Sequence, residues 1–161
     1  MNAAYGELAD RIRGTIGDLD LVAERVTYAW AQALKAADDQ YAYIDSTALN
    51  LHGFYSGLER LFEIIARQVD GDLPAGETWH RDLLLRMALD LPEARPAVIS
   101  QENAAVLDEF RRFRHLVRNV YTVNIVPSKV GKIVAGLPDL WTKLRAELSA
   151  FADFAEDVAA Q

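Results

Sequence analysis

The sequence predicts an all-α protein, an antiparallel bundle of four to five helices. Over long stretches the apolar residues recur at steps of three or four, which places them along one side of a helix. No stretch alternates apolar and polar residues as a half-buried strand does. Connections of modest length favour neighbouring helices that run in opposite directions. We therefore expect a single helical domain over residues 1–161.

Two long helices are expected in the first half of the chain. The first apolar stripe runs from residue 8 to residue 34, and the second runs from residue 44 to residue 69. The polar segment KAADDQ separates them. Gly71 and Pro74 end the second helix, because glycine readily adopts the left-handed cap conformation and proline cannot continue the hydrogen-bond ladder.

The second half of the chain carries a short helix and two longer ones. Thr78 is placed to cap a helix with the sequence WHRDLLLRMALDL. Ser100 is placed to cap the next helix, which contains a long apolar stripe. The last helical region is expected to begin after Pro127 with Ser128 as its cap, and to be interrupted at Pro138.

Composition excludes several classes of function. The net charge of −7 argues against a surface that grips nucleic acid over its whole face. Cysteine is absent, which excludes disulfides and thiolate sites, and the three histidines are too scattered for a metal motif. No apolar run is long enough to cross a bilayer, and the N-terminus has charges where a signal peptide is apolar. We expect a cytoplasmic protein with no membrane contact, no metal and no cofactor.

Arginine is concentrated in one segment of this acidic chain, DEFRRFRHLVRNVY. Four of the thirteen arginines lie there, together with a histidine and a tyrosine: Arg111, Arg112, Arg114, Arg118, His115 and Tyr121. At about 100° per residue, Arg114, Arg118 and Tyr121 project along one line of the helix. Arg111 and His115 stand beside that line. The apolar stripe begins next to it, so these groups are expected at the edge of the core.

This combination of side chains is suited to cleaving RNA without a metal. Guanidinium groups bind phosphate, while an imidazole or a phenol can move a proton. The RNA supplies its own 2′-hydroxyl as nucleophile, so the protein needs only a proton-transfer group and a cationic clamp. The competing interpretation is structural: Arg111 and Arg112 pair with acidic residues one turn away, and His115 is a boundary histidine. Those acidic residues are Asp108 and Glu109.

At these residues the sequence resembles the HEPN superfamily, and within it the HepT-like ribonuclease toxins paired with minimal nucleotidyltransferase antitoxins. The motif of those toxins is an arginine, four residues, a histidine, one residue and a tyrosine. Arg114 and Tyr121 fit the two ends of the motif, and Asn119 stands where it has histidine. The segments LNLHGFYSGLERLFEIIA, WHRDLLLRMA and ARPAVIS are also similar to the family, so the resemblance covers about two thirds of the chain.

The resemblance implies a metal-independent endoribonuclease that acts on RNA as a homodimer, with the two motifs facing each other. Arg114 and Arg118 would clamp the phosphate. The family's tyrosine is where the antitoxin attaches AMP, which nominates Tyr121 as a modified residue. Residues five apart on a helix point about 140° away from each other, so two copies could complete one site. Long amphipathic helices that leave apolar surface uncovered also favour a dimer.

Asn119 leaves the catalytic prediction open. An amide cannot act as a general acid or base near neutral pH. Either His115, one turn earlier, moves the proton while Asn119 hydrogen-bonds the substrate or the histidine, or catalysis is weak or absent. The alternative function is a noncatalytic helical subunit that binds a nucleotidyltransferase. A third interpretation is a helical interaction protein without nucleotide chemistry.

Two residues of the second helix are candidates for a supporting role. Tyr55 and Glu59 lie one turn apart, and a glutamate there could pair with Arg114 or Arg118 and hold its guanidinium in place. The competing interpretation is an ordinary charge on a helix surface. His52 and His80 have no motif partners. We assign both to the surface or to satisfied positions in the core.

Overall fold

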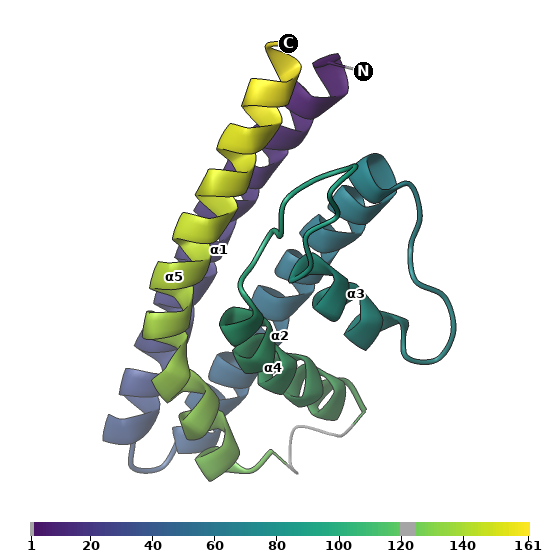
Figure 1. Cartoon of the computed structure of the whole chain (residues 1–161). Helices are drawn as coiled ribbons and strands as arrows, with labels where there is room; N and C mark the ends of the chain where they lie inside the picture. Colours follow the sequence, from purple (N-terminus) through teal and green to yellow (C-terminus); the bar gives the residue numbers. More distant parts are fainter. Residues whose placement is uncertain (1, 120–124) are drawn as a thin grey trace.

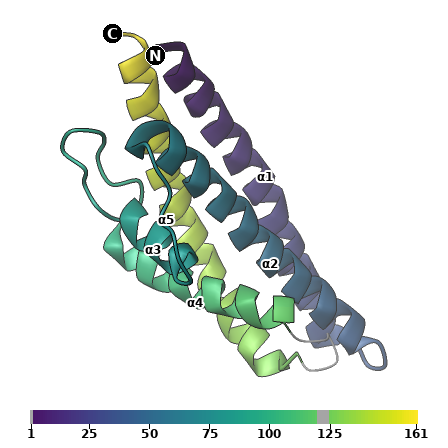
Figure 2. The same ribbon diagram turned by 90° about the vertical axis from the view of Figure 1, so that its right-hand side faces the viewer.

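The apolar stripes of the sequence form three long helices in the computed structural model. It describes residues 2–119 and 125–161, without the side chains of residues 2, 118 and 119. The long helices are α1 (Asn2–Lys35), α2 (Gln40–Ile65) and α5 (Pro127–Ala159). Both α2 and α5 run antiparallel to α1, and the two ends of the chain lie close together (Figures 1 and 2). The prediction of an all-α antiparallel bundle is confirmed.

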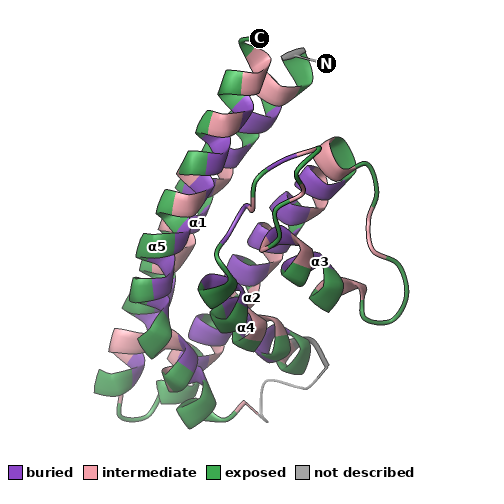
Figure 3. Cartoon of the chain, in the orientation of Figure 1, coloured by how far each residue is buried: buried purple, intermediate pink, exposed green. Residues whose placement is uncertain are grey.

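Two shorter helices pack beside α2. They are α3 (Trp79–Met87) and α4 (Gln101–Asn119); α4 contacts α2 and α5, while α3 contacts α4 and α2. Buried residues of all five α-helices form one hydrophobic cluster, and their buried faces point inward (Figure 3). Near its centre, the ring of Phe54 lies 5.9 Å from that of Phe110 and 5.5 Å from that of Trp141. These contacts join α2 to α4 and α5.

A π-helical turn, η1 (Ala66–Asp70), extends α2. The amide of Gly71 donates to the carbonyl of Ala66 at 2.9 Å and closes the turn. Gly71 has a φ of 94°, a left-handed conformation that glycine adopts at little cost. The helix therefore ends where the sequence predicts. The turn places Asp70 beside Arg95, far along the chain.

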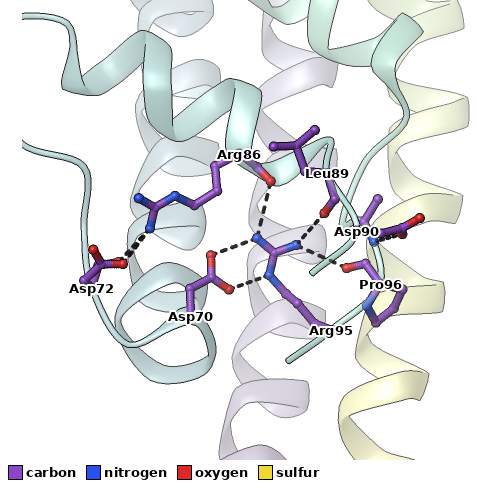
Figure 4. Close-up of polar contacts among 8 residues, drawn as sticks. Asp70, Asp72, Arg86, Leu89, Asp90, Arg95 and Pro96 are labelled. Carbon is purple, nitrogen blue, oxygen red and sulfur yellow. Dashed lines mark hydrogen bonds and ion pairs between the residues drawn. The ribbon is translucent and has the colours of Figure 1, made fainter. Parts of the chain in front are cut away.

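The buried side chain of Arg95 ties the segment after α3 to the end of η1 (Figure 4). Its Nε and Nη2 atoms donate to the two carboxylate oxygens of Asp70 at 2.6 and 2.8 Å. The other N–H groups donate to the carbonyl oxygens of Arg86, Leu89 and Pro96. All five donors of the guanidinium are thus engaged. We call these contacts the Arg95 brace, and they hold the C-terminal end of α3 against α2.

The third helix is shorter than predicted. It ends at Met87, whereas the sequence pattern continues to residue 91. Leu91 instead exchanges two backbone hydrogen bonds with Arg95, at 2.8 and 2.7 Å, and this turn delivers the Arg95 side chain to Asp70. Thr78 does precede the helix, but its hydroxyl donates to the carboxylate of Asp82 at 2.9 Å and caps no backbone amide.

Ser100 caps α4 as predicted: its hydroxyl accepts a hydrogen bond from the Asn103 amide at 3.1 Å. The predictions for α5 are wrong in two respects. Its N-cap is Val126 with Pro127 in the first turn, so Ser128 is not the cap, and the helix continues through Pro138. Proline in a helix interior costs about 3 kcal/mol. Burial of apolar side chains on both sides of Pro138, those of Leu137, Leu140 and Trp141, offsets that cost.

Candidate functional site

An ion pair between α2 and α4 lies at the centre of the candidate site. Nη1 of Arg114 donates to Oε1 of Glu59 at 2.9 Å, and the two side chains are only 11% and 5% exposed. From α3, Nδ1 of His80 lies 2.9 Å from the same oxygen. The guanidinium of Arg114 also lies over the ring of Tyr55, with Cζ 5.4 Å from the ring centroid. We call Tyr55, Glu59, His80 and Arg114 the Glu59 cluster.

Local sequence places two of these residues at the buried boundary of their helices. Glu59 follows Tyr55 by one turn and shares the buried face of α2. Arg114 follows the buried residues Phe110 and Phe113 on α4. His80 is at the beginning of α3, whose position depends on the Arg95 brace at its other end. Three helices therefore converge on one carboxylate.

The contact with Glu59 bears on where the proton of His80 lies. A carboxylate only accepts hydrogen bonds, so the 2.9 Å contact of Oε1 with Nδ1 favours the tautomer that carries its proton on Nδ1. Nη2 of Arg114, 3.2 Å from the same nitrogen, is then a close polar contact between two donors. In the neutral ring the lone pair is left on Nε2.

Three polar atoms of the Glu59 cluster are buried without a hydrogen-bond partner in the described part of the chain: Tyr55 Oη, Glu59 Oε2 and Arg114 Nε. Each such atom typically costs about 1–3 kcal/mol. Burial, reinforced by the Glu59 carboxylate, raises the pKa of the Tyr55 phenol well above its ordinary value. A buried charged cluster that is only partly satisfied is unfavourable for stability, and such clusters are typical of functional sites.

Glu59 thus makes the pairing with Arg114 that the sequence analysis offered as a possibility, and Tyr55 lies within cation–π distance of the same guanidinium. The supporting role of both residues in function stays a prediction. Arg114 is itself largely buried, so its charge is held in place by the protein and only a small part of it faces solvent.

Arg111 and Arg112 form ion pairs with an acidic residue one turn away, as the structural interpretation predicts. Nε of Arg111 donates to Asp108 at 2.8 Å, and Nε of Arg112 donates to the other oxygen of the same carboxylate at 2.9 Å. Burial raises the pKa of Asp108, but the hydrogen bonds from the two arginines outweigh it and the pKa is lowered. Asp108 is therefore the acidic partner of both residues.

The remaining predicted site residues lie further along α4. His115 is exposed, about 100° around the helix from the buried Arg114. Arg118 and Asn119 form the end of α4, and their side chains are not described. Tyr121 lies outside the described residues. The predicted alignment of Arg114, Arg118 and Tyr121 stays a prediction.

His80 is the residue that sequence reasoning missed. The sequence places it at the surface or at a satisfied core position and gives no link to Glu59, whereas in the structure its side chain is 28% exposed and contacts that carboxylate. It lies 21 positions from Glu59, beyond the turn at Gly71, so no helical spacing links the two residues. The sequence contains one indication of such a contact. Glu59 lies on the buried stripe of its helix, and a buried carboxylate needs polar partners.

The Glu59 cluster does not line the two open grooves beside Tyr28. Two open grooves flank Tyr28 of α1, one extending to Tyr43 and the other to Trp141, and neither includes a residue of the cluster. Within the described ranges, no three His, Asp or Glu side chains are grouped so as to hold a metal ion. Nor does any described helix combine the length and apolar character needed to cross a membrane.

The family comparison, together with the all-helical bundle, places the chain in the HEPN superfamily. More specifically, the chain belongs to the HepT-like family: residues 46–155 match the family described as HepT-like protein. The matched region begins in α2 and ends in α5, so it includes every residue of the Glu59 cluster. No curated protein and no solved structure gives a significant match.

Proposed function

We propose that this chain is the toxin of a toxin–antitoxin pair, a metal-independent endoribonuclease of the cytoplasm that works as a homodimer. The functional unit is the single helical domain over residues 1–161. Membership of the HepT-like family supports the proposal. The observation that carries it is Arg114, the motif arginine, which Glu59 holds in a buried and incompletely satisfied cluster.

The reaction needs few protein groups. Arg114 and Arg118 bind the phosphate and stabilise the charge that develops on it, while the 2′-hydroxyl of the RNA attacks phosphorus. Asn119 is a hydrogen-bonding group of the site, because an amide transfers no proton at neutral pH. Another group must therefore move the proton, and the sequence nominates the imidazole of His115.

Regulation is proposed at Tyr121. A minimal nucleotidyltransferase, the antitoxin, would attach AMP to its hydroxyl. A bulky negative charge beside Arg114 and Arg118 would then exclude an RNA phosphate by occupation and repulsion. Coexpression with the nucleotidyltransferase should add whole AMP units to the mass of the parent protein and none to Tyr121→Phe. Equal mass gain in the two proteins would place the modification elsewhere.

The activity is tested with purified, unmodified protein and RNA in the presence of a chelator. The parent should cleave RNA, and Arg114→Ala should lower the rate about 100-fold or more. Arg114→Lys keeps the charge but loses the forked geometry, which separates lost phosphate binding from loss of folding. Arg145→Ala, between α1 and α5, is the matched control. Intact RNA with the parent, together with unchanged growth on expression, would contradict the proposal.

A second candidate function is favoured by Asn119 at the motif's histidine position: a noncatalytic subunit that binds a nucleotidyltransferase. A stable complex with that enzyme, with no growth effect of either the parent or Arg114→Ala, would favour this role over the toxin. The two candidates share the fold and the partner, and they differ in whether the chain cleaves RNA.

A further inference from the structure

We infer that His80 on α3 is the proton-transfer residue of this site and that Glu59 on α2 is its positioning residue. The inference rests on the proposed ribonuclease function and names a catalytic group outside the arginine-rich segment. Its basis is the convergence of a buried carboxylate, an imidazole and the motif arginine from three helices.

Two contacts fix the orientation of the His80 ring. Glu59 accepts the proton on Nδ1 at 2.9 Å, which leaves the lone pair on Nε2. The indole of Trp79 stacks on the ring, with centroids 3.7 Å apart and planes 30° apart. Glu59 is 5% exposed and His80 is 28% exposed, so a buried carboxylate holds a solvent-accessible imidazole. Catalytic dyads of carboxylate and histidine have this arrangement, in which the carboxylate fixes the tautomer and the free nitrogen accepts a proton.

His80 is also close to the group that would hold the phosphate. Its Nδ1 lies 3.2 Å from Nη2 of Arg114. A phosphodiester bound at this guanidinium would therefore be near the imidazole. His115 occupies a different position: it follows Arg114 on α4 and is exposed, about 100° around the helix from the side that faces Glu59. Position 119 is an amide, and His80 is an imidazole that the fold brings to Arg114 within the described part of the chain.

The step is a balanced proton transfer and displacement. Nε2 of His80 takes the proton of the RNA 2′-hydroxyl, and the 2′ oxygen forms a bond to phosphorus. The bond from phosphorus to the 5′ oxygen breaks, and that oxygen takes a proton from water. The products are a 2′,3′-cyclic phosphate and a 5′-hydroxyl. The imidazolium returns its proton to solvent, and no oxidant or metal takes part.

The pH dependence of cleavage tests this assignment. Among the described residues, the charged groups that contact His80 are Glu59 on α2 and Arg114 on α4, and the ring of the neutral Tyr55 lies 5.4 Å from Cζ of the arginine. A base is active only when deprotonated, so the rate should fall as the solution is acidified. The parent should show this fall of the cleavage rate at acidic pH, and the residual activity of His80→Gln should not.

The decisive experiment measures RNA cleavage in chelator for the parent, His80→Gln, His115→Gln and the control His52→Gln. His80→Gln should fold normally by circular dichroism and cleave at least about 100-fold more slowly. His52→Gln should retain the parent rate. If the parent and His80→Gln cleave equally while His115→Gln is inactive, the inference is overturned and the proposed function stands. A parent that leaves RNA intact removes the proposed function and the inference with it.

The variant Glu59→Gln tests whether Glu59 positions the imidazole of His80 or only contributes to the fold. Nitrogen NMR of the imidazole should show the Nδ1–H tautomer for His80 in the parent. In Glu59→Gln the side-chain amide can present its NH₂ group to Nδ1, which would shift the proton to Nε2 and abolish the base. Loss of activity together with the tautomer change supports the inference. An unchanged tautomer with unchanged activity contradicts it.

Discussion

The guanidinium of Arg114 and the carboxylate of Glu59 lie 55 positions apart in the chain, and their nearest atoms are 2.9 Å apart. Both side chains are almost completely buried. Desolvation of such a pair offsets much of the attraction between its members. The pair therefore contributes little net stability, and its main effect is on position. It fixes α4 against α2 and presents one carboxylate oxygen of Glu59 to His80.

Breaking this pair should be strongly destabilising. Glu59→Ala leaves the Arg114 charge buried and uncompensated, so the free energy of unfolding should fall by about 3–5 kcal/mol. The double variant Glu59→Leu with Arg114→Met replaces both charges by apolar groups and should be more stable than Glu59→Leu alone or Arg114→Met alone. Urea denaturation of the parent, these two single variants and the double variant measures this. Strict additivity of the single effects would show that the two residues do not interact.

Tyr55→Phe should increase stability, which is unusual for a change in the core. The Tyr55 hydroxyl is buried without a partner, and removal of such a group relieves a desolvation cost of about 1–3 kcal/mol. Thermal unfolding checks the prediction, and a lower melting temperature for Tyr55→Phe would indicate that the hydroxyl has a stabilising partner.

The raised pKa of Tyr55 also gives a dependence on alkaline pH. A folded-state pKa above the unfolded value contributes stability that is complete below the unfolded pKa, near 10, and is lost as pH rises above it. The parent should therefore lose stability faster than Tyr55→Phe between about pH 10 and 11. Parallel stability curves for the two proteins over this range would contradict the assignment.

The Arg95 brace should be far more important for stability than a surface ion pair of similar geometry. Arg95→Ala leaves the buried carboxylate of Asp70 without its partner, and should cost about 3–5 kcal/mol. Arg13→Ala removes an equally short pair with Glu156, but both side chains are substantially exposed, so the change should be small. Chemical denaturation compares the two variants. Equal losses would show that burial does not decide the strength of these pairs.

Two glycines of α5 should respond in opposite directions to alanine. A Cβ at Gly131 would lie 2.8 Å from Cζ2 of Trp30, so Gly131→Ala should destabilise by about 1–3 kcal/mol. A Cβ at Gly136 has no atom within 4 Å, so Gly136→Ala should stabilise by up to about 1 kcal/mol through helix propensity. Melting temperatures of both variants check this. Relief of the Gly131→Ala defect by Trp30→Phe would identify the indole as its cause.

Asp108 should contribute a dependence on acidic pH. Burial opposes its ionisation, but the hydrogen bonds from Arg111 and Arg112 prevail and the pKa is lowered in the folded state. A lowered carboxyl pKa adds stability that is present above the unfolded value, near 4, and is lost as pH falls through the folded value. The stability difference between the parent and Asp108→Asn should therefore shrink below about pH 4. A difference independent of pH would argue against ionic pairing.

The sequence by itself determined the helices and several of their ends. Apolar spacing is a local property, and it located α1, α2, α4 and α5 before any contact was known. The helix end at Gly71 and the helix start at Ser100 were also determined by nearby residues. A left-handed glycine and a capping hydroxyl each act on the nearest turn. The arginine-rich segment was visible for the same reason.

Tertiary structure decided what each helix faces. Pro138 continues a helix because apolar residues around it are buried, and α3 ends early because Arg95 reaches Asp70. His80 joins Arg114 and Glu59 only because α3 packs beside α2 and α4. Periodicity specifies which face of a helix is buried but carries no information about the neighbour that buries it. The partners of a buried charge are set by packing between segments distant in sequence, and the candidate site is made of such partners.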